Sequence, residues 1–362
     1  MGSHSALDIA EGASAEGFST LVLAEAGRER TYAQYFRTLR DAAGRIQRGF
    51  VDEVWTYPKF HEAATPAAQE RLRARGVLMV PNRALSSYVS ADVLEESFRV
   101  PMVGSRAMLR IEERTERDNY YLLLEKASIP TPRRYESPQA IDALAMVKLP
   151  HATRRLERGF FTAGTPEEYQ RKSEQLLRQG TIAAADLRAA RIERYVVGPV
   201  FNFNFFFSPL VPRDEGLELL GVDERRESSL DGLVRLPAAQ QLELAEEERV
   251  PRYTVVGHGT LTVRESILEE VFRIGERFVD AARERYPPGI IGPFTLQTCL
   301  DADGRPTVFD VAVRIGGGTN IHLALGHPYG NALWRTPMST GRRLAIEVRR
   351  AVETGRLKEV VT

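Results

Sequence analysis

The sequence predicts a protein of mixed α/β and α+β class whose first part is a parallel α/β domain. In the first hundred residues, amphipathic stretches with helical spacing alternate with short apolar runs, a pattern typical of a parallel sheet. Further along, aromatic strands are followed by a long helix and a tight hairpin, which is typical of α+β structure. We therefore expect three domains, at residues 1–105, 106–190 and 191–362.

The first domain is expected to contain two helices and three buried strands. Helical spacing covers residues 7–16 and 67–75, and apolar runs at 20–24, 77–80 and 100–103 have the length of strands. A doubly wound domain normally opens with a strand, and none precedes the first helix. The alternation still favours a parallel sheet.

A long helix is expected to lead from the first domain into the second. Residues 105–128 form a charged amphipathic stretch that stops before the proline-containing break at 130–132. The second domain then has a strand at 145–149, an arginine-rich polar loop that runs to residue 158, and a helix at 166–179. This domain is expected to be a small α+β lobe.

The third domain is expected to be built on aromatic strands. Strands are predicted at 192–197, 201–207 and 217–222, a long helix at 265–285 and a closing amphipathic helix at 339–353. No internal repeat or low-complexity tract interrupts the chain.

Composition and charge restrict the classes of function. The net charge is +0, so no broad basic field favours nucleic acid or an anionic membrane as a partner. The single cysteine, Cys299, excludes an internal disulfide and a cysteine-based zinc site, and fits a reducing compartment. No apolar run has the length of a membrane span, and no signal peptide is recognised. We expect a cytoplasmic protein that acts on small molecules.

The hairpin near the C-terminus carries the clearest chemical pattern. Gln297 and Asp310 lie on its two strands, and Arg314, four residues after Asp310, returns to the same face. The run Gly316–Gly318 then lets backbone approach a ligand closely. Oxygen ligands, a fixed cation and bare amides suit a magnesium–polyphosphate complex. The alternative is a solvated hairpin with a surface salt bridge.

Together with Lys148 and the segment 224–228, this hairpin makes the chain resemble a known family, the archaeal formate-dependent FAICAR synthetases (PurP), which are ATP-grasp ligases. The resemblance lies in ordered stretches at 2–6, Pro81 with Tyr88, 193–198, 223–237, 264–266, 289–320 and 337–339. It implies an ATP-grasp fold in which an N-terminal pre-ATP-grasp domain precedes two ATP-grasp subdomains. It also implies ATP and Mg²⁺ as cofactors, and self-association into a homo-oligomer.

The implied reaction joins formate to the 5-amino group of the ribotide AICAR, with ATP split to ADP and phosphate through a formyl phosphate. By the same resemblance, Gln297 and Asp310 bind metal, although the family usually has Glu at the second position. Lys148 and Arg314 contact phosphate and are assigned to catalysis. The remaining residues expected around ATP are Glu193, Tyr195, Val196 and Glu227.

The resemblance assigns a second group of residues to the ribotide. His4 matches a ribotide-contacting histidine, so Gly2-Ser3-His4 is interpreted as native sequence, with a cloning remnant as the alternative. Gly27 and Arg28 are expected near the ribotide phosphate, with a simple turn as the alternative. Asn320, at the end of the glycine run, is expected on the same side.

Three departures from the family pattern concern the substrate. Ala84 stands where the family has a ribotide-contacting serine, and His258 where it has an asparagine. The glycine-rich lid is replaced by residues 151–159, whose arginines either take over phosphate binding or form a solvated loop. In addition, Tyr120 and Tyr121 occupy a stretch where a lysine often faces ATP. Losing polar partners in a pocket changes discrimination by orders of magnitude.

Three functions therefore remain open. The first is FAICAR synthesis itself, and the second is a related ligase that joins a different small acid or amine. The third is an ATP-binding regulatory protein with weakened turnover, favoured by Asp310 in place of Glu, by Ala312 and by the glycine-poor loop. Nucleic-acid binding has no support from a basic stripe.

Overall fold

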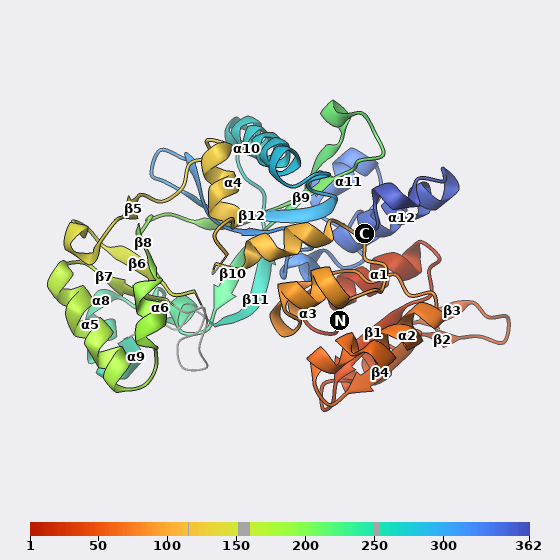
Figure 1. Ribbon diagram of the computed structural model, residues 1–362, viewed down its shortest axis with the longest axis horizontal. Coiled ribbons are helices and arrows are strands. Elements are labelled where there is room, and N and C mark those ends of the chain that lie inside the picture. The colour runs from red at the N-terminus through yellow and green to blue at the C-terminus, as the bar shows by residue number, and fades with distance from the viewer. Residues whose placement is uncertain (115, 151–159, 250–253) are drawn as a thin grey trace.

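The computed structural model describes residues 1–114, 116–150, 160–249 and 254–362. A five-stranded antiparallel sheet lies at its centre, in the order β11-β10-β9-β12-β13. The strands are β9 (Val200–Phe207), β10 (Leu217–Glu227), β11 (Val255–Thr260), β12 (Gly292–Leu300) and β13 (Pro306–Ala312). Figure 1 shows the long helix α10 (Glu265–Arg285) lying across this sheet.

The two faces of the central sheet differ because its strands alternate in polarity. In β9 the order Phe-Asn-Phe-Asn-Phe at 201–205 places phenylalanines on one face and asparagines on the other. Phe205 and Phe278 of α10 both stack on Phe294 of β12 in the largest core cluster. The opposite face is left to polar side chains.

A second antiparallel sheet forms a lobe on the left of Figure 1, in the order β5-β8-β6-β7. It has its own hydrophobic cluster, which includes Val147 and Phe161 and is covered by Tyr169 of α5. Its elements are β5 (Arg134–Tyr135), β6 (Ala145–Lys148), β7 (Phe160–Ala163), α5 (Pro166–Arg178), α6 (Ala184–Arg188) and β8 (Arg191–Arg194). The expected strand at 192–197 is therefore shorter, and Tyr195 and Val196 follow it.

The N-terminal part has less sheet than expected. Strands β1 (Leu21–Glu25) and β4 (Glu53–Tyr57) pair in parallel, and β2 (Leu39–Arg40) and β3 (Ile46–Arg48) form a small hairpin. The helices are α1 (Ala6–Ala15), α2 (Pro66–Ala74) and α3 (Arg83–Tyr88).

The predicted strands at 77–80 and 100–103 are wrong as regular strands. They make one parallel bridge, between Met79 and Met102. Met79 N donates to Pro101 O at 2.8 Å, and Val103 N donates to Met79 O at 2.8 Å. Pro81 and Pro101 have no N–H, so the ladder cannot be extended through them.

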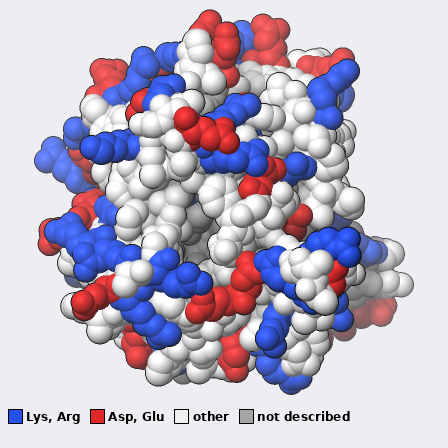
Figure 2. Space-filling view, turned by 90° about the vertical axis from the view of Figure 1, so that its right-hand side faces the viewer, with Lys and Arg blue, Asp and Glu red and all other residues white. Residues whose placement is uncertain are grey.

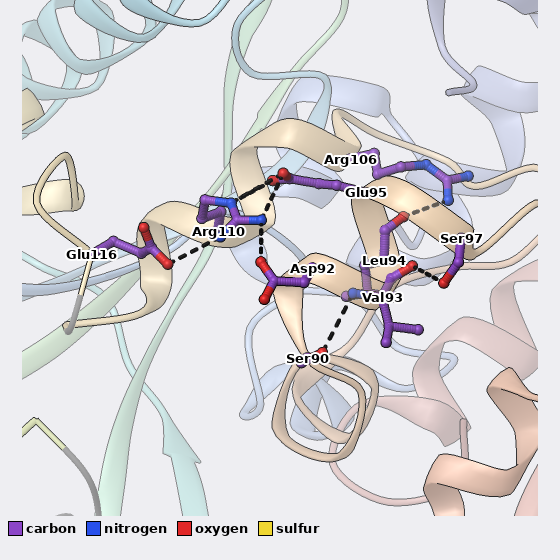
Figure 3. A network of polar contacts seen from close by, with 9 residues as sticks. All are labelled: Ser90, Asp92, Val93, Leu94, Glu95, Ser97, Arg106, Arg110 and Glu116. Carbon is purple, nitrogen blue, oxygen red and sulfur yellow. Dashed lines mark hydrogen bonds and ion pairs between the residues drawn. The ribbon is translucent and has the colours of Figure 1, made fainter.

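The single helix expected at 105–128 is also wrong. A 3-10 helix covers Arg106–Glu112, and α4 (Tyr120–Lys126) starts anew, with the Asn119 side chain accepting from Tyr121 N at 3.1 Å. Figure 3 shows Arg110 bonded to the carboxylates of Asp92, Glu95 and Glu116. These bonds hold the 3-10 segment, which carries Glu112 toward the central sheet.

The remaining helices follow the central strands. Helix α12 starts after Ser339, whose hydroxyl accepts from Arg342 N at 3.1 Å, and it packs on α1 at the other end of the chain. The helices are α7 (Leu230–Leu233), α8 (Ala238–Glu243), α9 (Glu246–Arg249), α11 (Pro328–Trp334) and α12 (Thr340–Glu353). Within the described ranges, no helix combines the length and apolar character that a membrane span requires.

The largest hydrophobic core cluster extends across the expected domain boundaries. One cluster combines Leu23 and Trp55 of the N-terminal part with Phe203 and Phe278 of the C-terminal part. The domain boundaries at 105 and 190 stay a prediction. On the face shown in Figure 2, basic and acidic side chains are interspersed.

Candidate functional site

A row of polar side chains crosses the polar face of the central sheet. Its members are consecutive cross-strand partners: Asp223 pairs with Asn202, Asn202 with Gln297, and Gln297 with Asp310. Directly opposed residues of antiparallel strands project to the same face. All except Asp310 are at most 8% exposed. The row therefore joins four strands into one polar floor.

Asp310 and Gln297 form the end of the row expected to bind metal. Burial raises the pKa of Asp310, but the positive charges of Arg114 and Lys148 outweigh it, so this pKa lies below its ordinary value. Arg114 Nη2 lies 4.0 Å from Asp310 Oδ2, and an Arg225 guanidinium nitrogen contacts Gln297 Oε1. Asp310 is thus an ionised carboxylate with cations at close range.

These residues fit a magnesium ion that is shared with a polyphosphate. Mg²⁺ prefers oxygen ligands and typically takes only one or two protein carboxylates, with water and phosphate completing its shell. In the part of the chain that the structure describes, no three His, Cys, Asp or Glu side chains are grouped as metal ligands. The donor set of Asp310 and Gln297 therefore suits a nucleotide-borne ion and not a closed metal centre.

A β-bulge brings Lys148 to the same end. The register of β12 and β13 shifts after Gln297, so the next pair is Thr298 with Val308, and Phe309 has no partner there. The Phe309 carbonyl accepts from Lys148 Nζ at 3.0 Å. Lys148 thereby connects the small lobe to the central sheet.

Lys148 is buried among groups that keep it charged. Its Nζ lies 2.5 Å from Glu193 Oε2 and 3.1 Å from the Tyr121 hydroxyl. Burial lowers the pKa of Lys148, but Tyr121 and Glu193 raise it more, and the net shift is upward. Tyr121, noted in the sequence as a departure, thus contacts the lysine.

The residues expected around ATP lie where the small lobe meets the central sheet. Glu193 is 1% exposed and bonded to Lys148 and Arg191, so it holds cations and does not form an open wall. Burial, with Cys299 and Glu227 nearby, raises the pKa of Tyr195. Val196 O accepts from Cys299 Sγ at 3.6 Å. Tyr195, Val196 and Glu227 are therefore grouped beside the end of β12.

Arg314 lies at the start of the glycine run and is 7% exposed. Its Nη2 donates to Glu112 Oε2 at 3.2 Å, its Nη1 to Ile315 O at 2.9 Å, and its Nε has no hydrogen-bond partner. Arg83 Nη1 lies 3.7 Å from the same Glu112 oxygen. Two guanidinium groups therefore share one carboxylate, which leaves an excess of positive charge.

The N-terminal arm presents His4 to this cluster. Residues Ser3 and His4 have positive φ angles of 97° and 50°, which non-glycine residues rarely adopt. Asn82 holds the arm, because its Nδ2 donates to Met1 O at 2.8 Å and Ser3 O at 3.2 Å. Asn320 Nδ2 contacts His4 O. The arm is thus fixed from two sides.

The chemistry of His4 is that of a neutral imidazole. The protein atoms around the ring, and then the charges of Arg314 and Arg83, lower the pKa of His4 to about 4. His4 itself is exposed, so the burial that lowers its pKa is only partial, and the nearby guanidinium charges add to it. At neutral pH, His4 can donate or accept a hydrogen bond to a polar ligand.

Two sets of residues expected to contact the ribotide do not lie at the cluster of His4, Arg83 and Arg314. Ala84 is fully buried in the largest core cluster, and the exposed residue beside it is Arg83. Gly27 and Arg28 lie in a turn after β1, where Gly27 has φ +87° and its N donates to Glu29 Oε2 at 2.6 Å. That turn leads to Tyr32, whose hydroxyl accepts from Ser3 N at 2.5 Å.

His258 occupies the opposite end of the polar row. It lies on β11, opposite Arg225, and its Nδ1 is 2.7 Å from Asp223 Oδ2. The arginine-rich loop at 151–159 lies outside the described residues, so its expected role as a lid stays a prediction.

Sequence reasoning missed most of the charged and polar residues that surround the candidate site. The alternation Phe-Asn-Phe-Asn at 201–204 carried a signal for the polar floor, and the spacing of Asp223 and Arg225 placed both on one face. The arginines around the site come from segments far apart in the sequence, so no local pattern marks them. The missed residues are Arg83, Glu112, Arg114, Arg191, Asn202, Asn204, Asp223 and Arg225.

Comparisons with known proteins cover the whole chain. Two family models match: a "protein of unknown function", DUF1246, at residues 1–135, and a "domain of unknown function", DUF1297, at residues 168–362. Two curated proteins named 5-formaminoimidazole-4-carboxamide-1-(beta)-D-ribofuranosyl 5'-monophosphate synthetase are 39% and 37% identical over 362 residues, from Methanothermobacter thermautotrophicus and Methanocaldococcus jannaschii. The match spans 100% of this chain and 93% and 94% of those proteins.

Solved structures agree on the fold. The IMP biosynthesis protein PurP from Thermococcus kodakaraensis has a TM-score of 0.72 at 29% identity, covering 99% of this chain and 98% of that one. Biotin carboxylase from Campylobacter jejuni has a TM-score of 0.60 at 10% identity, covering 94% and 67%. The expected ATP-grasp fold with an N-terminal α/β domain is confirmed.

Proposed function

The chain belongs to the family of 5-formaminoimidazole-4-carboxamide ribotide synthetases, and on that premise we propose that it joins formate to the 5-amino group of AICAR, with ATP split to ADP and phosphate. The observation that carries this proposal is the polar floor, which connects Asp310 at one end with His258 at the other. It supports a ligase that uses a nucleotide phosphate and an amine in one cleft.

The end of the floor at Asp310 is suited to phosphoryl transfer. Formate and the γ-phosphate are both anions, so positive charge must offset their repulsion. Lys148, Arg114 and Arg225 lie around Asp310 and Gln297 and supply that charge. A magnesium ion held by Asp310 and Gln297 would neutralise phosphate oxygens when bound. The product of this step is a formyl phosphate.

The other end of the floor is suited to the ribotide. We assign His4 and Asn320 to its contacts, because both lie beside Arg314 and the glycine run. Arg83 is the half-exposed cation that an anionic ribotide would meet there, while the buried Arg314 beside it stays assigned to the ATP phosphates. Glu193, Tyr195, Val196 and Glu227 are assigned to the nucleotide side. Gly27 and Arg28 remain assigned to the ribotide phosphate through the loop before Tyr32.

A related ligase with another amine is the second candidate. It is favoured by Ala84, which is buried and has no hydroxyl to offer, and by His258, which is tied to Asp223. A pocket that loses hydrogen-bonding groups for one substrate discriminates against it strongly. Turnover measured with a panel of small acids and amines would therefore distinguish this candidate from the first.

We further propose that the protein works in the cytoplasm on small molecules as a homo-oligomer, without nucleic acid or a membrane as partner. The relatives bear names of ribotide synthetases, which supports small-molecule substrates.

The test is ADP release with ATP, Mg²⁺, formate and AICAR, followed by identification of the product by mass. Product that carries one added formyl group, and requires all four components, is expected. Turnover only with another acid or amine would favour the second candidate. Tight ATP binding without ADP release under any combination would support the regulatory protein instead.

A further inference from the structure

An Asp–His pair at one end of the polar floor is not used by the steps above. Asp223 is completely buried, and its two oxygens accept hydrogen bonds from Asn204 Nδ2 at 2.6 Å and Asn202 Nδ2 at 2.7 Å. His258 Nδ1 lies 2.7 Å from Asp223 Oδ2. A carboxylate held by amide donors is an acceptor, so His258 must supply the proton at Nδ1. In the neutral ring, Nε2 is then free to accept a proton.

The pair is not required to hold the strands together. Strands β10 and β11 already pair through their backbones from Asp223–Thr260 to Glu227–Val255. The Asp223 carboxylate already has two side-chain donors without the histidine. The added bond therefore fixes the orientation of the ring, which is how a base is held ready in many active sites.

The imidazole ring of His258 lies beside the glycine run, where the backbone carries no side chains. A Cβ on Gly318 would come closer than 3.0 Å to both Asp223 Oδ2 and His258 Nδ1, and a Cβ on Gly317 would lie 3.5 Å from His4 Nδ1. Two imidazoles thus flank two consecutive residues that have no side chain. The His258 side chain is 17% exposed while that of Asp223 is 1% exposed. The accessible part of the pair is therefore the histidine.

We propose that His258 is the general base that takes the proton from the attacking amine, and that Asp223 is its positioning residue. This rests on the proposed function. The amine lone pair forms an N–C bond to the carbonyl carbon of the acyl phosphate. The bond between this carbon and the bridging phosphate oxygen breaks, and phosphate leaves with the bonding electrons. The amine proton passes to His258 Nε2 and then to solvent.

The charged and titratable groups around the Asp223–His258 pair come from several segments. Asp223 and Arg225 lie on β10, and His4 on the N-terminal arm lies near His258. Arg314, after β13, lies near His4, and His322 and His327 lie near Asp223. A protonated His258 cannot accept the amine proton. Acyl transfer should therefore slow at low pH through one protonation, whereas phosphoryl transfer to formate should not.

The test separates these two half-reactions. Formate-dependent positional isotope exchange of ¹⁸O in ATP, without amine, reports acyl phosphate formation; FAICAR formation reports the complete reaction. In His258→Gln, we expect exchange at the wild-type rate and FAICAR formation slower by about 10²-fold or more, the usual size of general-base catalysis. The acidic limb of the pH profile should disappear, and added imidazole should restore part of the rate. His61→Gln, at an exposed histidine of the 3-10 helix Phe60–Ala64, is the matched control.

Asp223 is tested by its pH profile. Asp223→Asn should lower kcat with little change in the KM for AICAR and should move the acidic limb to lower pH, because the carboxylate no longer stabilises the imidazolium. Asp223→Glu should restore part of kcat and the position of the limb. A residue with only a structural role would lower activity without moving that limb.

Several results would overturn the proposal. An unchanged acidic limb and rate in His258→Gln would do so, and so would an equal loss of exchange and FAICAR formation. Should that variant fail to fold, as judged by circular dichroism, the wild type decides: an acidic limb in both half-reactions or in neither excludes the base. Wild type without exchange and without product would refute the proposed function itself, which is a different outcome.

Discussion

At the residue scale, Lys148 shows how one side chain joins separate parts of the site. Its ammonium contacts Glu193 of β8, the hydroxyl of Tyr121 in α4 and the carbonyl of Phe309 in β13. Opposite charge next to a buried ammonium maintains its charged form. The lysine can therefore serve as a fixed cation for phosphate while it also links the small lobe to the central sheet.

Removing either phosphate-side cation should impair catalysis. Lys148→Ala or Arg314→Ala is expected to lower kcat/KM by about 10²-fold or more, roughly 3 kcal/mol of transition-state stabilisation, because a fixed charge is lost where negative charge develops. Steady-state kinetics with ATP varied would measure this. The exposed Lys126→Ala is the control. Unchanged rates in both variants would remove these residues from the phosphate site.

Asp310 should govern the requirement for magnesium. Asp310→Asn removes the carboxylate charge and leaves Arg114 without this acidic partner, so half-saturation should need at least about tenfold more Mg²⁺. Asp310→Glu keeps the charge and should need far less than the asparagine variant. A magnesium titration of ADP release measures both. Equal requirements in wild type and Asp310→Asn would place the metal elsewhere.

At the scale of elements, the contact between α1 and α12 positions the N-terminal arm. Gly12 and Gly341 allow the two backbones to approach: a Cβ on Gly341 would come closer than 3.0 Å to the Asp8 backbone, and one on Gly12 equally close to that of Arg342. Neither backbone can give way like a flexible side chain. The close crossing therefore requires glycine on both helices.

Gly341→Ala should destabilise the protein. Forced separation of α1 and α12 is expected to cost about 1–3 kcal/mol, as overpacking does elsewhere, and to raise the KM for the amine because His4 precedes α1. Gly232→Ala in α7 is the matched control, since a Cβ there meets nothing within 4 Å. Thermal unfolding and substrate titration measure the two effects. An equal melting temperature for both variants would contradict the packing argument.

At the scale of the whole molecule, the site is assembled from both ends of the chain. His4 and Asn320 are 316 residues apart in sequence, and the contact between them closes the arm onto the glycine run. Asp8 N donates to Asn320 Oδ1 at 3.1 Å, and Asp8 Oδ2 accepts from Gly341 N at 3.1 Å. Folding of the N-terminal segment and formation of the site are thus coupled.

The buried Asp8 gives this coupling a pH dependence. Burial raises the pKa of Asp8 to about 6, against hydrogen bonds from Ser339, Thr319 and Gly341 that lower it. Between pH 3.8 and 6 the folded chain therefore holds a proton that the unfolded chain has released. This stabilising contribution is complete below the unfolded pKa and is lost as the pH rises through 6.

The prediction compares wild type with Asp8→Asn, so that other titrating groups cancel. Relative to the variant, wild type should gain on the order of 1 kcal/mol of unfolding free energy between pH 7.5 and pH 5. Urea unfolding at several pH values measures this difference. A difference that stays constant over that range would show that Asp8 is not protonated in the folded protein.

Local periodicity predicted the elements that depend on their own sequence. Helix α10 was predicted with its bounds, because 21 residues of 3.6-residue periodicity leave little alternative. The opposition of Gln297 and Asp310 also followed from strand alternation across a short turn. The long helix before α4 was wrong because Arg110 binds three carboxylates and Asn119 starts a new helix. Such contacts leave no periodic signal.

By itself, the sequence determined the fold family, the hairpin that pairs Gln297 with Asp310, and Lys148 at the end of its strand. The fold family followed from the resemblance to PurP. The hairpin pairing and the place of Lys148 depend on short spacings, which strand alternation encodes directly. Only the tertiary structure decided that Ala84 is buried, that Arg83 and Arg314 share Glu112, and that His258 is bonded to Asp223. Each of these depends on which distant segments become neighbours, and the free energy that selects those neighbours comes from packing of the whole chain.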